Sequence, residues 1–419
     1  MSGKPVLDTL ISGAAQVLTC AASSGIGLRA DVQVGVRDGK IACVDSPQAV
    51  AEGFDIASAI VIDATGKTVL PGFVDCHTHL VFGGSRVDEY VASLEGISKG
   101  EMARRGIKTG LAASMESTRG ASDDQLASQA LDRLRNMLRN GTTTAEVKSG
   151  YGLSTEAELR QLRTVNRLRK EQPITLHPTF LGAHMWPPDT SKAEYLELLI
   201  SEMIPRVAGE GLAEFCDIWC DDGYYDAEEC GRVLRCAQRA GMLAKLHTGA
   251  YSYIGGADLA AEIGAVSADH LNFTPPSALR KLAQAGVVGV LLPGTDFCVN
   301  HPKPFQLRPI LDAEVKTALG TNLNPGCWVE SMRTVMVLAC RRHGMMPEQA
   351  MVAATLHGAM ALAVEEDTGS LEAGKNADIQ IWDTSDWRTA IYRIDRNPVE
   401  IVLKGGRIVV ERGNGAIGR

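Results

Sequence analysis

The stretch that decides the fold is Val69-Leu70-Pro71-Gly72-Phe73-Val74-Asp75-Cys76-His77-Thr78-His79-Leu80. After Pro-Gly, Phe73 and Val74 begin a short apolar strand. Side chains on a strand alternate between its two faces, so His77 and His79 are expected to point the same way. The alternative is two ordinary surface histidines, but a pair of imidazoles at the end of an apolar strand favours metal binding.

The composition is that of a soluble globular enzyme larger than one ordinary domain. The chain has 419 residues, of which 45% are hydrophobic and 22% charged, and a formal net charge of −8. The negative charge argues against a nucleic-acid partner, and neither a membrane span nor a signal peptide is recognisable. The ten cysteines are therefore expected to be free thiols, and the protein to be cytoplasmic.

Both ends of the chain are rich in short alternating strands with Gly-containing turns. We expect residues 1–70 and 369–419 to form one small β-sandwich domain built from both termini. Between them, residues 71–368 contain eight strand candidates with helical connections, which predicts a (β/α)8 TIM barrel of the metal-dependent hydrolase type. A long excursion after the first barrel strand, residues 81–122, is expected to fold over the site.

Polar side chains fall at the ends of the predicted strands, where a barrel places its site. They are His77, His79, Lys148, His184, His247, His270 and Asn322. Each alone has a structural explanation, such as a solvated lysine or a helix cap, but seven converging on one mouth indicate a site. His177 is expected to be structural, and no ligand role is expected for His301, His343 and His357, which lie in loop or helical contexts.

Several motifs resemble the imidazolonepropionase family of the amidohydrolase superfamily. They are Glu146-Val147-Lys148-Ser149-Gly150-Tyr151-Gly152-Leu153, Phe180-Leu181-Gly182-Ala183-His184, Ser267-Ala268-Asp269-His270-Leu271 and Asn324-Pro325-Gly326. The similarity runs along nearly the whole chain. It implies a hydrolase that opens the cyclic amide of 4-imidazolone-5-propanoate to N-formimidoyl-glutamate, with one zinc or iron ion as cofactor.

The resemblance also implies the residues of the site. The metal ligands would be His77, His79, His247 and Asn322. The substrate contacts would be Arg86, Tyr151, His184, Asn324 and Gly326. His270 would polarise the scissile carbonyl or shuttle a proton, and Arg86 suits a propanoate carboxylate. The implied partners are a small cyclic amide with a carboxylate tail and a second copy in a homodimer, with no nucleic acid and no membrane.

The chain departs from the family pattern at four places. Asn322 replaces an aspartate, and an amide cannot act as a general base. Gly249 and Ala250 replace a glutamate near the metal and a glutamine on the substrate ring. Cys327 replaces a small hydroxyl residue, and residues 105–110 replace a triple glycine. Imidazolonepropionase stays the leading expectation, and these changes place a relative acting on a methylated, hydantoin or thio-substituted ring close behind it. The alternatives are a catalytically impaired homologue acting as a binding protein, and a deaminase on the same fold.

Overall fold

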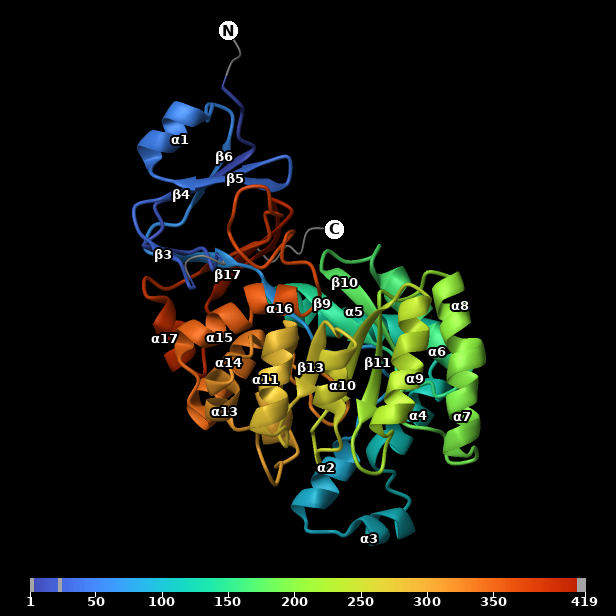
Figure 1. The fold of residues 1–419 in the computed structure, drawn as a ribbon. Coiled ribbons are helices and arrows are strands. Elements are labelled where there is room, and N and C mark those ends of the chain that lie inside the picture. Colours follow the sequence, from blue (N-terminus) through green and yellow to red (C-terminus); the bar gives the residue numbers. More distant parts are fainter. Residues whose placement is uncertain (1–3, 22–24, 413–419) are drawn as a thin grey trace.

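The computed structural model describes residues 4–21 and 25–412. Three β-sheets organise this part of the chain. One sheet forms a barrel, and the other two lie beyond one end of it (Figure 1). Within the described ranges, no helix has both the length and the apolar character that a membrane span requires.

The barrel sheet contains eight strands that follow one another in the order of the chain. Each is paired in parallel with its neighbour. They are β8 (Phe73–Asp75), β9 (Thr142–Lys148), β10 (Thr175–Ala183), β11 (Phe215–Cys220), β12 (Leu243–Thr248), β13 (Ser267–His270), β14 (Val288–Leu291) and β15 (Thr317–Leu319). The predicted (β/α)8 barrel is therefore confirmed.

Helices connect the barrel strands and cover the outside of the sheet (Figure 1). Their apolar residues recur at helical spacing: in α9, for example, Cys230, Val233, Leu234 and Ala237 are buried. The connecting helices are α5 (Asp123–Arg139), α6 (Thr155–Leu168), α7 (Lys192–Leu198), the π-helical η1 (Leu199–Met203), α8 (Ile204–Gly209), α9 (Ala227–Arg239), α10 (Gly256–Glu262), α11 (Pro276–Ala285), α12 (Pro293–Cys298), α13 (Leu307–Asp312), α14 (Met332–His343), α15 (Pro347–Ala353) and α16 (Leu356–Met360).

The excursion after β8 forms three helices, α2 (Val87–Leu94), α3 (Lys99–Arg104) and α4 (Gly110–Gly120). In Figure 1, α2 and α3 lie at the end of the barrel opposite the two smaller sheets. Residues of this excursion line the cavity at the carboxyl ends of the strands. The segment therefore folds over the site, as its length after the first strand predicted.

The two smaller sheets pack against each other and combine both ends of the chain. Val34 and Ile41 of one sheet share a buried core with Val69 and Ile379 of the other. The first sheet has the order β5 (Lys40–Asp45), β4 (Gln33–Arg37), β1 (Thr9–Ser12) and β6 (Ile60–Asp63). The second has the order β18 (Arg407–Glu411), β17 (Val399–Lys404), β16 (Ile379–Trp382), β7 (Thr68–Pro71), β2 (Gln16–Leu18) and β3 (Leu28–Arg29). Two helices accompany them, α1 (Pro47–Gly53) and α17 (Trp387–Tyr392).

The chain passes from the sandwich into the barrel with a single residue between two strands. Gly72 separates β7 from β8, and a Cβ atom there would lie 2.1 Å from Thr143 Oγ1. Only glycine allows this close approach of the first barrel strand to the second. The composite sandwich is thus present, while its exact boundaries at residues 70 and 369 stay a prediction.

A buried carboxylate closes the barrel between its first and last strands. Asp75 Oδ2 accepts a hydrogen bond from Thr321 Oγ1 at 2.6 Å, and Asp75 Oδ1 accepts one from the Thr321 backbone N–H at 3.0 Å. Just beyond, the Asn322 N–H donates to the His77 carbonyl at 2.9 Å. These hydrogen bonds between the first and last strands therefore fix the segment that carries His77 and His79.

Replacing Asp75 with alanine should weaken this closure, because it leaves the buried Thr321 N–H and hydroxyl without their acceptor. At about 1–3 kcal/mol per orphaned group, the free energy of unfolding should fall by about 2–6 kcal/mol, measured by urea denaturation. Asp75→Asn is the matched control, because its amide oxygen can still accept from the backbone and should preserve most of the stability. Equal losses in the two variants would show that the carboxylate does not close the barrel.

Candidate active site

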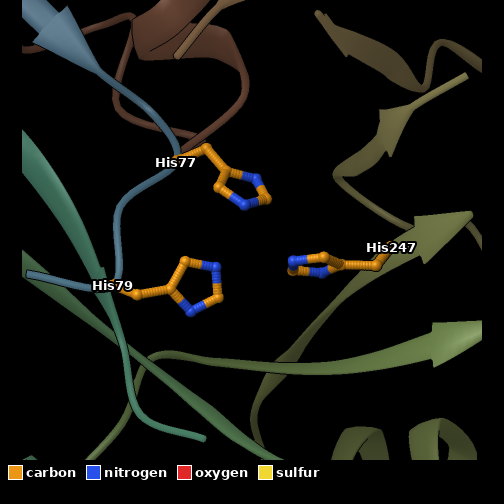
Figure 2. Close-up of side chains that lie close together, drawn as sticks. All are labelled: His77, His79 and His247. Carbon is orange, nitrogen blue, oxygen red and sulfur yellow. The ribbon is translucent and has the colours of Figure 1, made fainter. Parts of the chain in front are cut away.

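Three histidines from two strand ends point toward one another (Figure 2). His77 and His79 follow the end of β8, and His247 lies in β12. One ring nitrogen from each lies within 4.8 Å of the others, and all three side chains are buried. Three converging imidazoles with room for a further ligand are typical of a catalytic metal site. The structure brings the predicted histidines together, and their role as ligands stays a prediction.

The ring nitrogens that face this centre are suited to bind a cation. His77 Nε2 and His247 Nε2 are buried and have no hydrogen-bond partner among the described residues. Burial lowers the pKa of His77 and of His79 well below the ordinary histidine value, so both rings are neutral at pH 7. Buried polar atoms without partners are unfavourable, and coordination of a divalent cation would satisfy them. The donor set therefore fits a divalent metal ion.

Two buried carboxylates contact the Nδ1 atoms of His77 and His247. His77 Nδ1–H donates to Asp269 Oδ2 at 2.6 Å, and His247 Nδ1 lies 2.9 Å from Asp217 Oδ2. A carboxylate on one ring nitrogen keeps the proton there and leaves the lone pair of the other nitrogen for a metal ion. Asp269 and Asp217 thus orient His77 and His247 toward the common centre.

A fully buried lysine joins the two orienting carboxylates. Lys148 Nζ lies 2.7 Å from Asp217 Oδ2, 3.6 Å from Asp269 Oδ2 and 2.9 Å from Glu146 Oε1. Burial lowers the pKa of Lys148, but the three carboxylates outweigh it and raise the pKa above the usual value. Lys245 Nζ, 3.1 Å from Glu146 Oε1, completes the cluster. The sequence pattern placed Lys148 at the mouth, whereas the structure places it beneath the histidines.

A cavity of about 600 Å³ lies at the carboxyl ends of the strands. From the strand ends it is lined by His79, Tyr151, His184, Trp219, His247, His270 and Asn322. From the excursion it is lined by Arg86, Lys99, Thr109, Gly110, Leu111 and Ala112. His301, Asn324 and Gly326 also line it. The predicted substrate contacts therefore share one cavity with the histidines, and His301 joins them although its sequence context gave no indication of this.

Arg86 presents a fixed guanidinium to this cavity. Its Nε and Nη2 donate to the Glu89 carboxylate at 2.6 and 2.9 Å. A Cβ atom at Gly326 would lie only 2.9 Å from Arg86 Nη1, so glycine makes room for the guanidinium. This close approach brings Arg86 and Gly326 into the same site although they lie far apart in the sequence.

An aromatic wall, formed by His184, Trp219 and Tyr224, covers one side of the cavity. The Trp219 ring stacks on Tyr224 at 3.9 Å and on His184 at 5.3 Å between ring centroids. His184 Nδ1–H donates to the Gly150 carbonyl at 3.2 Å, and burial lowers the pKa of His184 to about 3. A wall of stacked neutral rings is suited to a flat ring ligand. Trp219 and Tyr224 were not identified from the sequence.

The amide of Asn322 is held by its neighbours. Its Nδ2 donates to Thr295 Oγ1 at 2.8 Å, and its Oδ1 accepts from Asn324 Nδ2 at 3.1 Å. Asn324 Oδ1 in turn accepts the backbone N–H groups of Gly326 and Cys327 at 2.7 and 3.0 Å. The Asn324 side chain therefore shapes the loop that faces the cavity, and its predicted contact with a substrate stays untested.

His270 occupies a strained backbone position at the end of β13. Its φ angle is +82°, and Leu271 follows with φ +63°. Non-glycine residues rarely adopt this left-handed region, and such strain is concentrated at functional sites. The imidazole of His270 lies beside the histidine centre, with its ring centroid 5.3 Å from that of His247.

Sequence comparisons relate the chain to known proteins. Models described as "Amidohydrolase family" match residues 60–113 and 237–409. An imidazolonepropionase of Symbiobacterium thermophilum is 41% identical over 98% of this chain and 99% of its own length. One of Alkaliphilus metalliredigens is 39% identical over 97% and 99%.

Solved structures show the same fold at low sequence identity. An adenosine deaminase of Xanthomonas campestris with bound zinc has a TM-score of 0.70 at 20% identity, covering 98% of this chain and 94% of that one. An atrazine chlorohydrolase of Arthrobacter aurescens complexed with zinc has a TM-score of 0.68 at 17% identity, covering 96% and 95%.

Metal content tests the histidine centre. The purified protein should bind about one divalent ion per chain, and His77→Ala should lose it, because the remaining ligands are too few for a stable site. Elemental analysis after reconstitution with zinc or iron gives the stoichiometry. His177→Ala is the matched control, since His177 pairs with Glu214 away from the cavity and should keep the metal. A wild-type protein that binds no metal would remove the basis for a metal centre.

Lys148 should affect metal affinity through the carboxylates that it joins. Lys148→Met should weaken metal binding by about 10- to 100-fold, because Asp217 and Asp269 would lose the cation that positions them. Chelator competition measures the affinity. Lys245→Met is the control, because it also removes a buried cation from Glu146 and should cost a similar 3–5 kcal/mol or so of stability. Lys245 acts on Asp269 only from a distance, whereas Lys148 forms ion pairs with both Asp217 and Asp269. Equal metal affinities in the two variants would contradict a positioning role.

Proposed function

The chain belongs to the imidazolonepropionase family of amidohydrolases, and on that premise we propose that His77, His79 and His247 hold one zinc or iron ion. Asn322 would be a weaker fourth ligand. The protein is a metal-dependent hydrolase of the imidazolonepropionase type, which acts on a C–N bond of a small cyclic amide. The observation that carries the proposal is the meeting of the three imidazoles, two of which line the same cavity as Arg86. A cytoplasmic location and a homodimer remain part of the proposal.

Substrate binding follows from the charges and rings of the cavity. An ion at the histidine centre supplies Lewis acidity, which polarises an amide carbonyl and makes water a better nucleophile. Arg86 would bind the propanoate carboxylate, because its planar guanidinium pairs well with a carboxylate. The aromatic wall would hold the flat ring and exclude water from it. The tail and the ring would therefore be bound by different walls of the cavity.

Amide hydrolysis also needs a group that takes a proton from water and gives it to the leaving nitrogen. Asn322 cannot do this, and Gly249 has no side chain, so we assign the proton transfer to His270. Burial lowers the pKa of His270 well below the ordinary value. The neutral ring can accept the proton, and the imidazolium that forms is a strong acid toward the leaving nitrogen. His184 is the second candidate, because it belongs to the aromatic wall that would hold the ring of the substrate.

The ring end of the cavity supports a substrate with an altered ring. Gly249 has φ +68°, and a Cβ atom there would lie 2.7 Å from Thr274 Oγ1. The backbone at this position therefore disfavours any larger side chain, including the glutamate of the family pattern. With Ala250 beside it, this wall lacks the polar groups that would bind ring nitrogens. We propose a hydantoin, thio-substituted or methylated relative of 4-imidazolone-5-propanoate, with that compound itself as the other candidate.

A substrate panel tests the function. The metal-loaded protein is incubated with 4-imidazolone-5-propanoate and its hydantoin, 2-thiohydantoin and N-methyl analogues, and products are identified by mass spectrometry together with an ammonia assay. At least one ring should open, and His270→Asn should abolish that turnover while keeping the metal content. If His270→Asn keeps most of its kcat, the proton-transfer role is wrong.

Other outcomes of the panel separate the rival functions. Ammonia release without ring opening would indicate a deaminase, and binding without turnover would indicate a binding protein. Asn322→Asp provides a further control. If it raises turnover of 4-imidazolone-5-propanoate by orders of magnitude from near zero, the chain is an inactivated copy rather than an enzyme with its own substrate.

Arg86 is tested by a substrate pair that differs only at the tail. Arg86→Ala should raise KM for the carboxylate substrate, with a loss of about 2–5 kcal/mol in kcat/KM, because a desolvated charge pair is broken. The corresponding carboxamide should lose little, since it carries no charge for the guanidinium. Steady-state kinetics on both compounds measures the difference, and equal losses would show that Arg86 does not bind the tail.

A further inference from the structure

His301 presents an N–H donor that the mechanism above does not use. It follows helix α12, lines the cavity and is only 7% exposed. The Lys303 backbone N–H donates to His301 Nδ1 at 3.1 Å, so Nδ1 carries a lone pair. In a neutral imidazole the proton then lies on Nε2. Within residues 4–21 and 25–412, this buried Nε2 has no hydrogen-bond partner.

The loop that carries His301 is fixed in place. The His301 backbone N–H donates to the Asp296 carbonyl at 2.9 Å, and Asp296 Oδ2 accepts from the Phe305 N–H at 3.0 Å. Asn272 Nδ2 donates both to Asp296 Oδ1 at 2.8 Å and to the Lys303 carbonyl at 3.1 Å. The imidazole is thus held in one orientation before any ligand binds, as a recognition group requires.

The ring of His301 also lies beside the wall that lost its polar groups. It stacks on Tyr251, with ring centroids 4.9 Å apart and planes 30° apart. Tyr251 directly follows Ala250, and both line the cavity. The wall that carries Gly249 and Ala250 in place of the family's glutamate and glutamine is therefore adjacent to a buried donor. A buried donor discriminates strongly against ligands that leave it unpaired.

We propose that His301 is a specificity-determining residue whose Nε2–H donates a hydrogen bond to an exocyclic acceptor of the substrate ring. This inference rests on the proposed function. The scissile carbonyl belongs at the histidine centre and the carboxylate at Arg86. The acceptor left for His301 is a carbonyl or thiocarbonyl on the ring carbon between the two nitrogens. His301 therefore selects a hydantoin or thiohydantoin ring over an imidazolone ring, which has only a C–H there.

Two substitutions distinguish the Nε2–H donor of His301 from the hydrogen bond that its Nδ1 accepts from Lys303. The Oδ1 of His301→Asn can still accept the Lys303 N–H, but the variant has no nitrogen at the Nε2 position. His301→Gln can place an N–H donor near the Nε2 position. For each protein, kcat/KM and equilibrium affinity are measured on hydantoin-5-propanoate and 4-imidazolone-5-propanoate, and metal content is measured in parallel. His301→Asn should lower the hydantoin-to-imidazolone ratio by about tenfold or more, and His301→Gln should restore part of it.

An unchanged ratio in His301→Asn, with metal content intact, would overturn the inference. If the wild type opens no ring of the substrate panel, the proposed function fails, but the affinity ratio still tests His301. A hydantoin preference in binding that is lost in His301→Asn would then support the role of His301 without the proposed function. Failure of the wild type to bind hydantoin-5-propanoate would overturn the inference.

Discussion

The site depends on a cluster of charges that water does not reach. Three carboxylates, from Glu146, Asp217 and Asp269, face the ammonium groups of Lys148 and Lys245, and all five side chains are fully buried. Removing such charges from water is costly, and only close pairing with good geometry offsets that cost. The pairing also leaves the carboxylates in excess over the lysines by one. An excess of negative charge directly beneath neutral imidazoles favours a cation above them, so the cluster links the stability of the barrel interior to the chemistry at its mouth.

The barrel makes this cluster possible because its strands alternate inward and outward side chains. Asp217 and Trp219 are two residues apart on β11, and Lys245 and His247 are two residues apart on β12. Inward-facing positions two apart occupy successive layers of the interior. Strands β11 and β12 therefore place Asp217 and Lys245 one level below Trp219 and His247, which are paired in register. The same short strand segments supply both levels, which is why the metal centre and its support cannot be separated in the fold.

The sequence predicted the elements well and the contacts between distant strands less well. Apolar runs with intervening helical patterns identified the barrel, and the His-x-His pair with His247 indicated the centre. The partners of Lys148 could not be predicted. Asp217 lies on β11, two strands away from β9, and the height of Asp217 along the barrel axis depends on the register between these strands. A charged residue within an apolar strand, as at Asp269, was the available signal. His301 was missed for another reason: it lies in a loop whose position is set by Asp296 and Asn272 rather than by strand or helix periodicity.

The junction at Gly72 also bears on how the protein is made. Strand β7 leads directly into β8 and its histidine pair, and β7 pairs with β16, whose residues Ile379–Trp382 are synthesised some three hundred positions later. The barrel seam likewise needs Thr321. Contacts so distant in sequence form late, after the intervening chain is available. On the ribosome, the segment bearing His77 and His79 therefore emerges long before Thr321 and residues 379–382, which hold it in place. A metal ion that needs the complete histidine centre would accordingly bind only after those later residues have been translated.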